Sequence, residues 1–117
     1  MRLHEIAEKL GLECLTPEIQ ATKEVDLREG YASDLLSDVL ANAPHGGVLV
    51  TVQVHLNVIA VAMHAELAAI IFASGRVPDV EVREKAVEEG IVLYVSQESA
   101  FDVVGKLYNL GIRGHYA

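Results

Sequence analysis

The chain has 117 residues, 51% of them hydrophobic and 22% charged, which excludes a disordered chain and predicts one domain with its own core. Its formal net charge of −8 disfavours nucleic acids and anionic membranes as partners, because both attract basic surfaces. Cys14 is the only cysteine, so an intrachain disulfide is excluded and a reducing cytoplasm is the expected compartment.

The first quarter of the chain predicts one helix and two short strands. Residues 1–11 carry apolar side chains at helical spacing and end at Gly11, a common helix terminator. A short strand is expected at residues 12–15 and a loop at residues 16–23, which include a proline. Acidic and apolar residues alternate over residues 24–28, the pattern of a half-exposed strand at the edge of a sheet.

A second helix is expected at residues 34–42, with Ser33 as its N-cap. Asp34 and Asp38 lie near its start, where negative charge favours the helix dipole. Four apolar side chains are expected to form its buried face: Leu35, Leu36, Val39 and Leu40.

The most apolar part of the chain, residues 47–75, predicts a strand–helix–strand unit. The runs at residues 48–52 and 67–73 are continuous and rich in β-branched or aliphatic side chains, which is typical of strands buried on both faces. Between them, Asn57 is a natural N-cap for a short helix at residues 58–63. The two strands are therefore expected to be parallel.

The last third predicts helix, strand and helix. Asp79 is the expected N-cap of a helix that ends at Gly90, with Glu81 and Lys85 paired on its outer face. A buried strand is expected at residues 91–95. Ser99 should cap a final helix at residues 100–110. Its expected core face is Ala100, Val103, Val104 and Leu107. The remaining residues, 113–117, read as a short mobile tail.

Together these segments predict an α/β fold: a single domain, residues 1–117, with a mostly parallel sheet of about five strands and helices packed over it. The positions of the first two strands in the sheet are left open. No apolar run is long enough for a membrane span, and residues 1–11 lack the apolar region of a signal peptide.

Small and polar residues follow four of the predicted strands. Parallel strands end at one edge of a sheet, where helices begin, and this edge, called the rim below, is the expected ligand site. Eight residues are predicted to bind a ligand there: Ser33, Gln53, His55, Asn57, Ser74, Gly75, Arg76 and Ser99. Arg76 is their one cation, so the expected ligand is a phosphorylated or carboxylated metabolite or a nucleotide. The competing interpretation is that Ser33, Asn57 and Ser99 only cap helices.

No pattern in the sequence indicates catalysis or a metal site. Gly-x-Ser-x-Gly, the Walker loop and Gly-x-Gly-x-x-Gly are all absent from the sequence. His55 and His64 are too far apart to form a helical pair of metal ligands. Cys14 lies among apolar residues and is expected to be an inert core side chain. A protein that is not an enzyme and carries no cofactor or metal is therefore expected.

Four stretches resemble small stand-alone DRTGG-domain proteins. They are GYASDLLSDV at residues 30–39, VQVHLNVIAVA at 52–62, ELAAII at 66–71 and SAFDVVGKLY at 99–108, and the resemblance covers nearly the whole chain. The sequence departs from the family in its name, because contiguous Asp-Arg-Thr-Gly-Gly is absent. Residues 73–76 stand where such domains often have a Thr-Gly-Gly-like turn, and this weakens the case for a glycine-lined phosphate contact.

The resemblance implies a regulatory role. DRTGG modules occur in phosphotransacetylases and CBS-domain pyrophosphatases, and the N-terminal domain of HPr kinase/phosphorylases is similar. The kinase phosphate loop is absent here, so a serine-kinase label would lack support in the sequence. We therefore expect a non-enzymatic regulatory or ligand-binding module. The alternative is a structural interaction protein that dimerises or docks on a metabolic enzyme. A homodimer is expected because the chain is short and strongly aliphatic.

Overall fold

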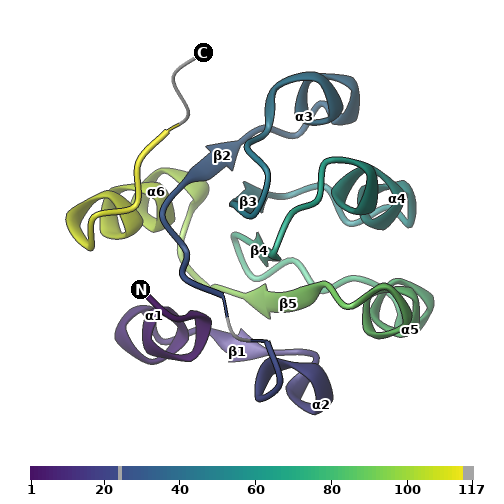
Figure 1. The fold of residues 1–117 in the computed structure, drawn as a ribbon, viewed down its shortest axis with the longest axis horizontal. Helices are drawn as coiled ribbons and strands as arrows, with labels where there is room; N and C mark the ends of the chain where they lie inside the picture. The colour runs from purple at the N-terminus through teal and green to yellow at the C-terminus, as the bar shows by residue number, and fades with distance from the viewer. Residues whose placement is uncertain (24, 115–117) are drawn as a thin grey trace.

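A five-stranded sheet forms the centre of the computed structural model, which describes residues 1–23 and 25–114 (Figure 1). The strands are β1 (Glu13–Cys14), β2 (Gly30–Ala32), β3 (Val48–Thr51), β4 (Ala69–Phe72) and β5 (Val92–Val95). Their order is β1-β5-β4-β3-β2; the last four are mutually parallel and β1 runs antiparallel to β5. The predicted mostly parallel α/β fold is confirmed, and the first two strands lie at opposite edges.

Helices cover both faces of the sheet. They are α1 (Leu3–Leu10), α2 (Pro17–Gln20), α3 (Leu36–Asn42), α4 (Asn57–His64), α5 (Val80–Glu89) and α6 (Ala100–Asn109). Figure 1 shows α3, α4 and α5 stacked on one side of the sheet and α1 and α6 on the other. The short α2 lies at the β1 end of the sheet. Where residues 16–23 were expected to be a loop, Pro17 at the first helical position starts this extra turn of helix.

Alternating side chains of the strands fill two separate cores. On β4, Ala69 and Ile71 join the core beneath α1 and α6, whereas Ile70 and Phe72 join the core beneath α3, α4 and α5. The three central strands are buried along their whole length. This burial on both faces explains why the central apolar runs show no alternation of polar and apolar residues.

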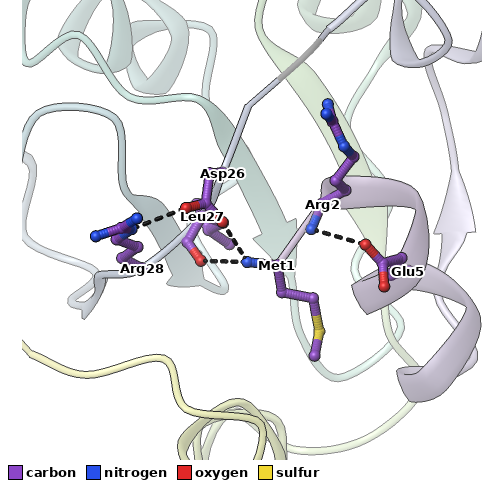
Figure 2. Close-up of polar contacts among 6 residues, drawn as sticks. All are labelled: Met1, Arg2, Glu5, Asp26, Leu27 and Arg28. Carbon is purple, nitrogen blue, oxygen red and sulfur yellow. Dashed lines mark hydrogen bonds and ion pairs between the residues drawn. The ribbon is translucent and has the colours of Figure 1, made fainter.

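The segment 24–28 is not the edge strand that its alternating pattern predicts. Its described residues form one isolated bridge, between Asp26 and Arg2, and β2 begins later, at Gly30. The reason is visible in Figure 2: the Met1 amino group donates to Asp26 Oδ1 at 2.5 Å and to the Leu27 carbonyl at 3.2 Å. Arg28 donates to the other Asp26 oxygen at 2.8 Å. The start of the chain therefore holds this segment, so β3 does not pair with it. Glu24 lies outside the described residues.

Helix α3 is shorter and less buried than predicted. It begins at Leu36 and not at Asp34, because Leu35 N–H bonds to Ser33 Oγ and Asp34 turns toward β3. Only Val39 of its expected core residues is fully buried, while Leu35 and Leu40 are 64% and 52% exposed. The expected buried face was therefore wrong for these two leucines. In so short a helix, the spacing of apolar residues does not show which of them a neighbouring helix or strand will bury.

The later helices lie where the sequence predicts them, but one ion pair and one cap differ. Asp79 and Gly90 bound α5 as expected, but Lys85 pairs with Glu88 and Glu89 on the following turn, not with Glu81. Asn57 is the first residue of α4, which has Leu56 as its N-cap.

Val104 on α6 is 38% exposed, whereas a core position was expected. Beyond α6, Arg113 is not part of a mobile tail. Its backbone bridges to Glu29, and its guanidinium lies 3.8 Å from the centre of the Tyr108 ring. Residues 115–117 of the predicted tail lie outside the described residues.

Candidate functional site

The rim expected from the sequence exists as a feature of the topology. Strands β2, β3, β4 and β5 are parallel and adjacent, so their carboxyl ends lie along one edge of the sheet. The turns that hold the eight predicted residues follow these four ends. Hydrogen bonds join the turns in two neighbouring pairs.

The first pair joins the turn after β2 to the turn after β3. Ser33 N–H donates to the Val50 carbonyl at 3.3 Å. Asp34 Oδ1 accepts from Thr51 Oγ1 at 2.8 Å and from Val52 N–H at 2.9 Å. Asp34 thus fastens the two turns together. From its place before α3, Asp34 was expected only to favour the helix dipole. The signal for its actual role is Thr51, a hydroxyl residue at the end of an apolar strand, which the structure buries.

Polar side chains of the β3–α4 loop bond to the backbone of the same loop. Gln53 N–H donates to Thr51 Oγ1 at 3.0 Å, and His55 N–H donates to Gln53 Oε1 at 3.1 Å. Asn57 N–H then donates to His55 Nδ1 at 3.0 Å. Each side chain therefore serves the residue two positions later, as in an Asx-type turn. Gln53 and His55 shape the loop, and His55 needs an unprotonated Nδ1 to do so.

The second pair joins the turn after β4 to the turn after β5. Ser74 and Gly75 have left-handed φ angles of 58° and 66°. Ser74 N–H donates to the Glu98 carbonyl at 2.7 Å, and Gly75 N–H donates to the Ser96 carbonyl at 2.8 Å. The φ of Gly75 lies in the left-handed region, which favours glycine at this position.

Arg76 is exposed at the rim and its guanidinium makes no hydrogen bond or ion pair with the described residues. Four residues further on, α5 begins after Asp79, whose side chain accepts no bond from the first turn of that helix. On the neighbouring turn, Ser99 Oγ accepts from Asp102 N–H at 3.3 Å and caps α6. The capping interpretation therefore holds for Ser99. Ser33 lies two residues before Leu35, the N-cap of α3, and Asn57 directly follows Leu56, the N-cap of α4, so neither is a cap.

Four hollows on the surface of the described part of the chain lie away from the rim residues, and their linings include none of the eight predicted residues. Nor does any hydrogen bond or ion pair join the side chain of Arg76 to Asn57 or Ser99 among the described residues. The rim therefore offers a cation on an open edge, and its ligand-binding role stays a prediction.

Sequence reasoning missed an apolar groove between β2 and α6. It has a volume of about 250 Å³. Its floor is formed by β2 and β3, its wall by α6 and its end by the segment after α6. The lining residues are Gly30, Tyr31, Ala32, Val50, Val104, Leu107, Tyr108, Ile112, Arg113 and Gly114. A wider, more open hollow of about 920 Å³ continues along α6 and shares Ala32, Val104 and Tyr108 with the groove. The small residues Gly30 and Ala32 line the groove, and Gly30 is also closely packed, since a Cβ there would lie 3.3 Å from Val48 Cγ1. These two positions on β2 are the signal in the sequence.

Metal binding and membrane insertion find no support among the described residues. They contain no cluster of three or more His, Cys, Asp or Glu side chains placed to hold a metal ion. None of the helices formed by these residues has the length and apolarity required to cross a bilayer. Cys14 is half-buried, and burial raises the pKa of its thiol. At neutral pH the thiol is therefore protonated, the unreactive form.

Comparison with known proteins supports the fold. The sequence matches no known family pattern and no curated protein. A solved structure does match: the CBS and DRTGG domains of the regulatory region of Clostridium perfringens pyrophosphatase, complexed with its activator diadenosine tetraphosphate. The TM-score is 0.73 at 15% identity, over 90% of this chain and 45% of that one. The chain has a DRTGG-like fold.

The DRTGG-like fold agrees with the resemblance found in the sequence. The chain spans about half the length of the matched structure, whose regulatory region also includes CBS domains. The likeness therefore applies to one structural unit of that region and, at 15% identity, to its fold.

Proposed function

We propose that this chain is a regulatory module, not an enzyme, and that it binds an anionic metabolite or nucleotide at the rim of its sheet. The observation that carries the proposal is Arg76, an exposed cation without an ion pair among the described residues, in a chain with a net charge of −8. The acidic remainder of the surface repels anions, so binding is confined to the rim.

The surroundings of Arg76 support an anion. The helices α4, α5 and α6 begin at the rim, and the positive ends of their dipoles favour negative charge there. Several rim N–H groups are already bonded, among them those of Ser74, Gly75 and Asn57. The attraction therefore comes from the Arg76 charge and from the uncapped first turn of α5.

The regulatory role draws on the fold comparison. The matched pyrophosphatase structure is a regulatory region with a bound nucleotide activator. A module of this fold that binds a nucleotide would couple ligand level to the activity of a metabolic enzyme. The absence of catalytic motifs from the sequence agrees with this role.

Isothermal titration tests the rim with three probes: diadenosine tetraphosphate, ATP and inorganic phosphate. We expect at least one probe to bind, and Arg76→Ala to weaken it by about 1.5–3 kcal/mol, the usual value of a hydrogen bond to a charged group. This corresponds to roughly 10- to 150-fold in Kd. Arg76→Ala should leave the unfolding midpoint unchanged, because the side chain is exposed and unpaired among the described residues.

Arg28→Ala is the matched control. It removes the same charge from an exposed arginine that pairs with Asp26, away from the rim. Affinity that falls equally in both variants would indicate diffuse electrostatics, and affinity unchanged by Arg76→Ala would contradict the rim proposal.

A second candidate function, self-association, is favoured by a different observation. Large apolar side chains are exposed on α6 beside the groove, with Phe101 88% exposed. Side chains of this kind in such numbers on one helix are typical of an interaction surface.

A further inference from the structure

Gly105 lies in the middle of α6 although nothing in the described part of the chain requires a glycine there. A Cβ built on Gly105 meets no atom within 4 Å among the described residues. Its φ is not in the left-handed region that favours glycine. Glycine weakens a helix interior relative to alanine, so its presence here needs another cause.

Three exposed apolar side chains surround this glycine. Phe101, Val104 and Tyr108 are 88%, 38% and 55% exposed. Their spacing of three and four residues places them on one side of the helix. Phe101, Val104, Gly105 and Tyr108 are together called the α6 patch.

The α6 patch has a protruding side chain, Phe101, and lies beside the groove between β2 and α6. Phe101, near the start of α6, is the most exposed large apolar side chain of the described chain. The groove, with its volume of about 250 Å³, opens beside the second half of the helix, at Tyr108 and Ile112. A surface that carries both parts of a contact is suited to pairing with itself.

The charges around the patch cancel. Two carboxylates and two cations line the groove and the hollow that continues it: Glu98, Asp102, Lys106 and Arg113. Lys106 pairs with Glu98 at 2.6 Å, and Arg113 lies over the Tyr108 ring. The chain as a whole has a net charge of −8, so most of its surface would repel a second copy. The α6 patch is a face on which two copies can meet without that repulsion.

We propose that the α6 patch binds a second copy of this chain, with the two α6 helices crossing antiparallel at Gly105 on a two-fold axis. Phe101 precedes the crossing point by four residues and Tyr108 follows it by three. In an antiparallel pair, each Phe101 therefore lies over the second half of the partner helix, where the groove opens. The missing Cβ of Gly105 lets the two helix backbones approach closely. This interface is separate from the rim, and it stands or falls independently of anion binding.

Sedimentation velocity over a concentration series tests the interface. The wild-type chain should sediment at twice the mass of the 12.7 kDa chain. Phe101→Lys should raise the dimer Kd by at least about tenfold, as expected for an aromatic residue at the centre of an interface. Leu40→Lys is the control, because Leu40 is a 52% exposed side chain on α3, across the sheet from α6. A wild-type chain that stays monomeric at every soluble concentration would overturn the proposal.

Gly105 gives a second test that separates folding from assembly. Gly105→Ala should raise the unfolding midpoint of the monomeric Phe101→Lys background, because alanine favours the helix and has room for its Cβ. In the wild-type background, Gly105→Gln should raise the dimer Kd by at least about tenfold, because its side chain blocks the crossing. Dimers that tolerate both Gly105→Gln and Phe101→Lys would place the contact elsewhere, for example on the exposed leucines of α3.

A disulfide across the axis fixes the geometry. Residues on a two-fold axis lie close to their own copies, within the roughly 4.4–6.8 Å between Cα atoms that a disulfide needs. In a Cys14→Ala background, Gly105→Cys should give a covalent dimer on mild oxidation, whereas Leu40→Cys should not. A covalent dimer formed equally by both variants would reflect random collision and contradict the crossing at Gly105.

Discussion

The two faces of the sheet differ in how completely they are covered. Helices α3, α4 and α5 pack on one face, and among the described residues α1 and α6 pack on the other (Figure 1). The strand residues match this difference. On β4, the bulky Ile70 and Phe72 point toward the three helices, whereas Ala69 and Ile71 point toward α1 and α6.

On the face that carries α1 and α6, a groove remains between β2 and α6. Gly30 and Ala32 line the groove there, next to exposed side chains of α6. On the opposite face, Tyr31 packs at the margin of the core. One face of the sheet is therefore closed over by helices, whereas the other carries the groove and the α6 patch that we propose as an interface.

The largest expected effect comes from replacing a buried leucine by alanine, once on each face of the sheet. Leu49 is 0% exposed beneath the three helices, and Leu107 is 4% exposed beside the groove. We expect Leu49→Ala to cost about 4–5 kcal/mol and Leu107→Ala about 2–3 kcal/mol, the upper and lower parts of the usual range. The groove already lacks atoms on one side of Leu107, and its wall can relax.

Urea denaturation of both variants gives these free energies of unfolding. Val103→Ala, also buried on α6 but away from the groove lining, serves as a reference for the helix itself. Equal losses for Leu49→Ala and Leu107→Ala, or a larger loss for Leu107→Ala, would mean that the two faces are equally well packed.

A smaller effect is expected at the rim, where two aspartates lie just before helices. Asp34→Ala removes the acceptor of the buried Thr51 hydroxyl and of Val52 N–H, so it should cost about 1–3 kcal/mol. Asp79→Ala is the matched control, because the Asp79 side chain makes no capping bond; it should change stability by less than about 0.5 kcal/mol. Thermal unfolding of both variants measures the difference. Similar losses would indicate that helix dipoles, and not the bonds to β3, stabilise the rim.

The smallest effect is a pH dependence on the α1 and α6 side. The Met1 amino group, and then Arg28, lower the pKa of Asp26 to about 2 from its ordinary 3.8. A folded pKa below the unfolded one contributes stability above pH 3.8, and this contribution is lost as the pH falls through about 2. Because Asp26 is exposed, the effect should be small.

Urea midpoints of the wild type and Asp26→Asn, measured from about pH 5 to about pH 2, check this dependence. The variant should be less stable at the upper end, and the difference should shrink as the carboxyl is protonated. A difference that stays constant over this interval would show that Asp26 acts through packing and not through its charge.

Long apolar runs made most of the fold predictable. The strands β3, β4 and β5 and the helix ends at Gly11, Gly90 and Ser99 follow from patterns that local interactions already determine. The wrong predictions concern segments whose structure or burial depends on residues far away in the sequence. Met1, just before α1, bonds to the Leu27 carbonyl 26 residues further along the chain. Whether Leu40 or Val104 is buried depends on helices elsewhere in the chain.

The position of the eight candidate residues along one edge of the sheet was predictable, but the hydrogen bonds that they make were not. Topology alone put the eight residues on one rim. Their backbone bonds could not be foreseen, because Gln53 and His55 each meet an N–H group two residues away in a loop of irregular geometry. The groove was missed because its lining comes from β2, β3, α6 and residues 112–114, which are distant in the sequence and meet only in the folded chain.

The backbone contact at Arg113 has a consequence for aggregation. An unpaired sheet edge is a template on which other chains can add strands. Here Arg113 N–H donates to the Arg28 carbonyl at 3.0 Å, and Gly30 N–H donates to the Arg113 carbonyl at 2.9 Å, so the chain covers the start of its own β2 edge. Shortening the protein before Arg113 would uncover this edge, and such fragments should form thioflavin-positive fibres that the intact chain resists.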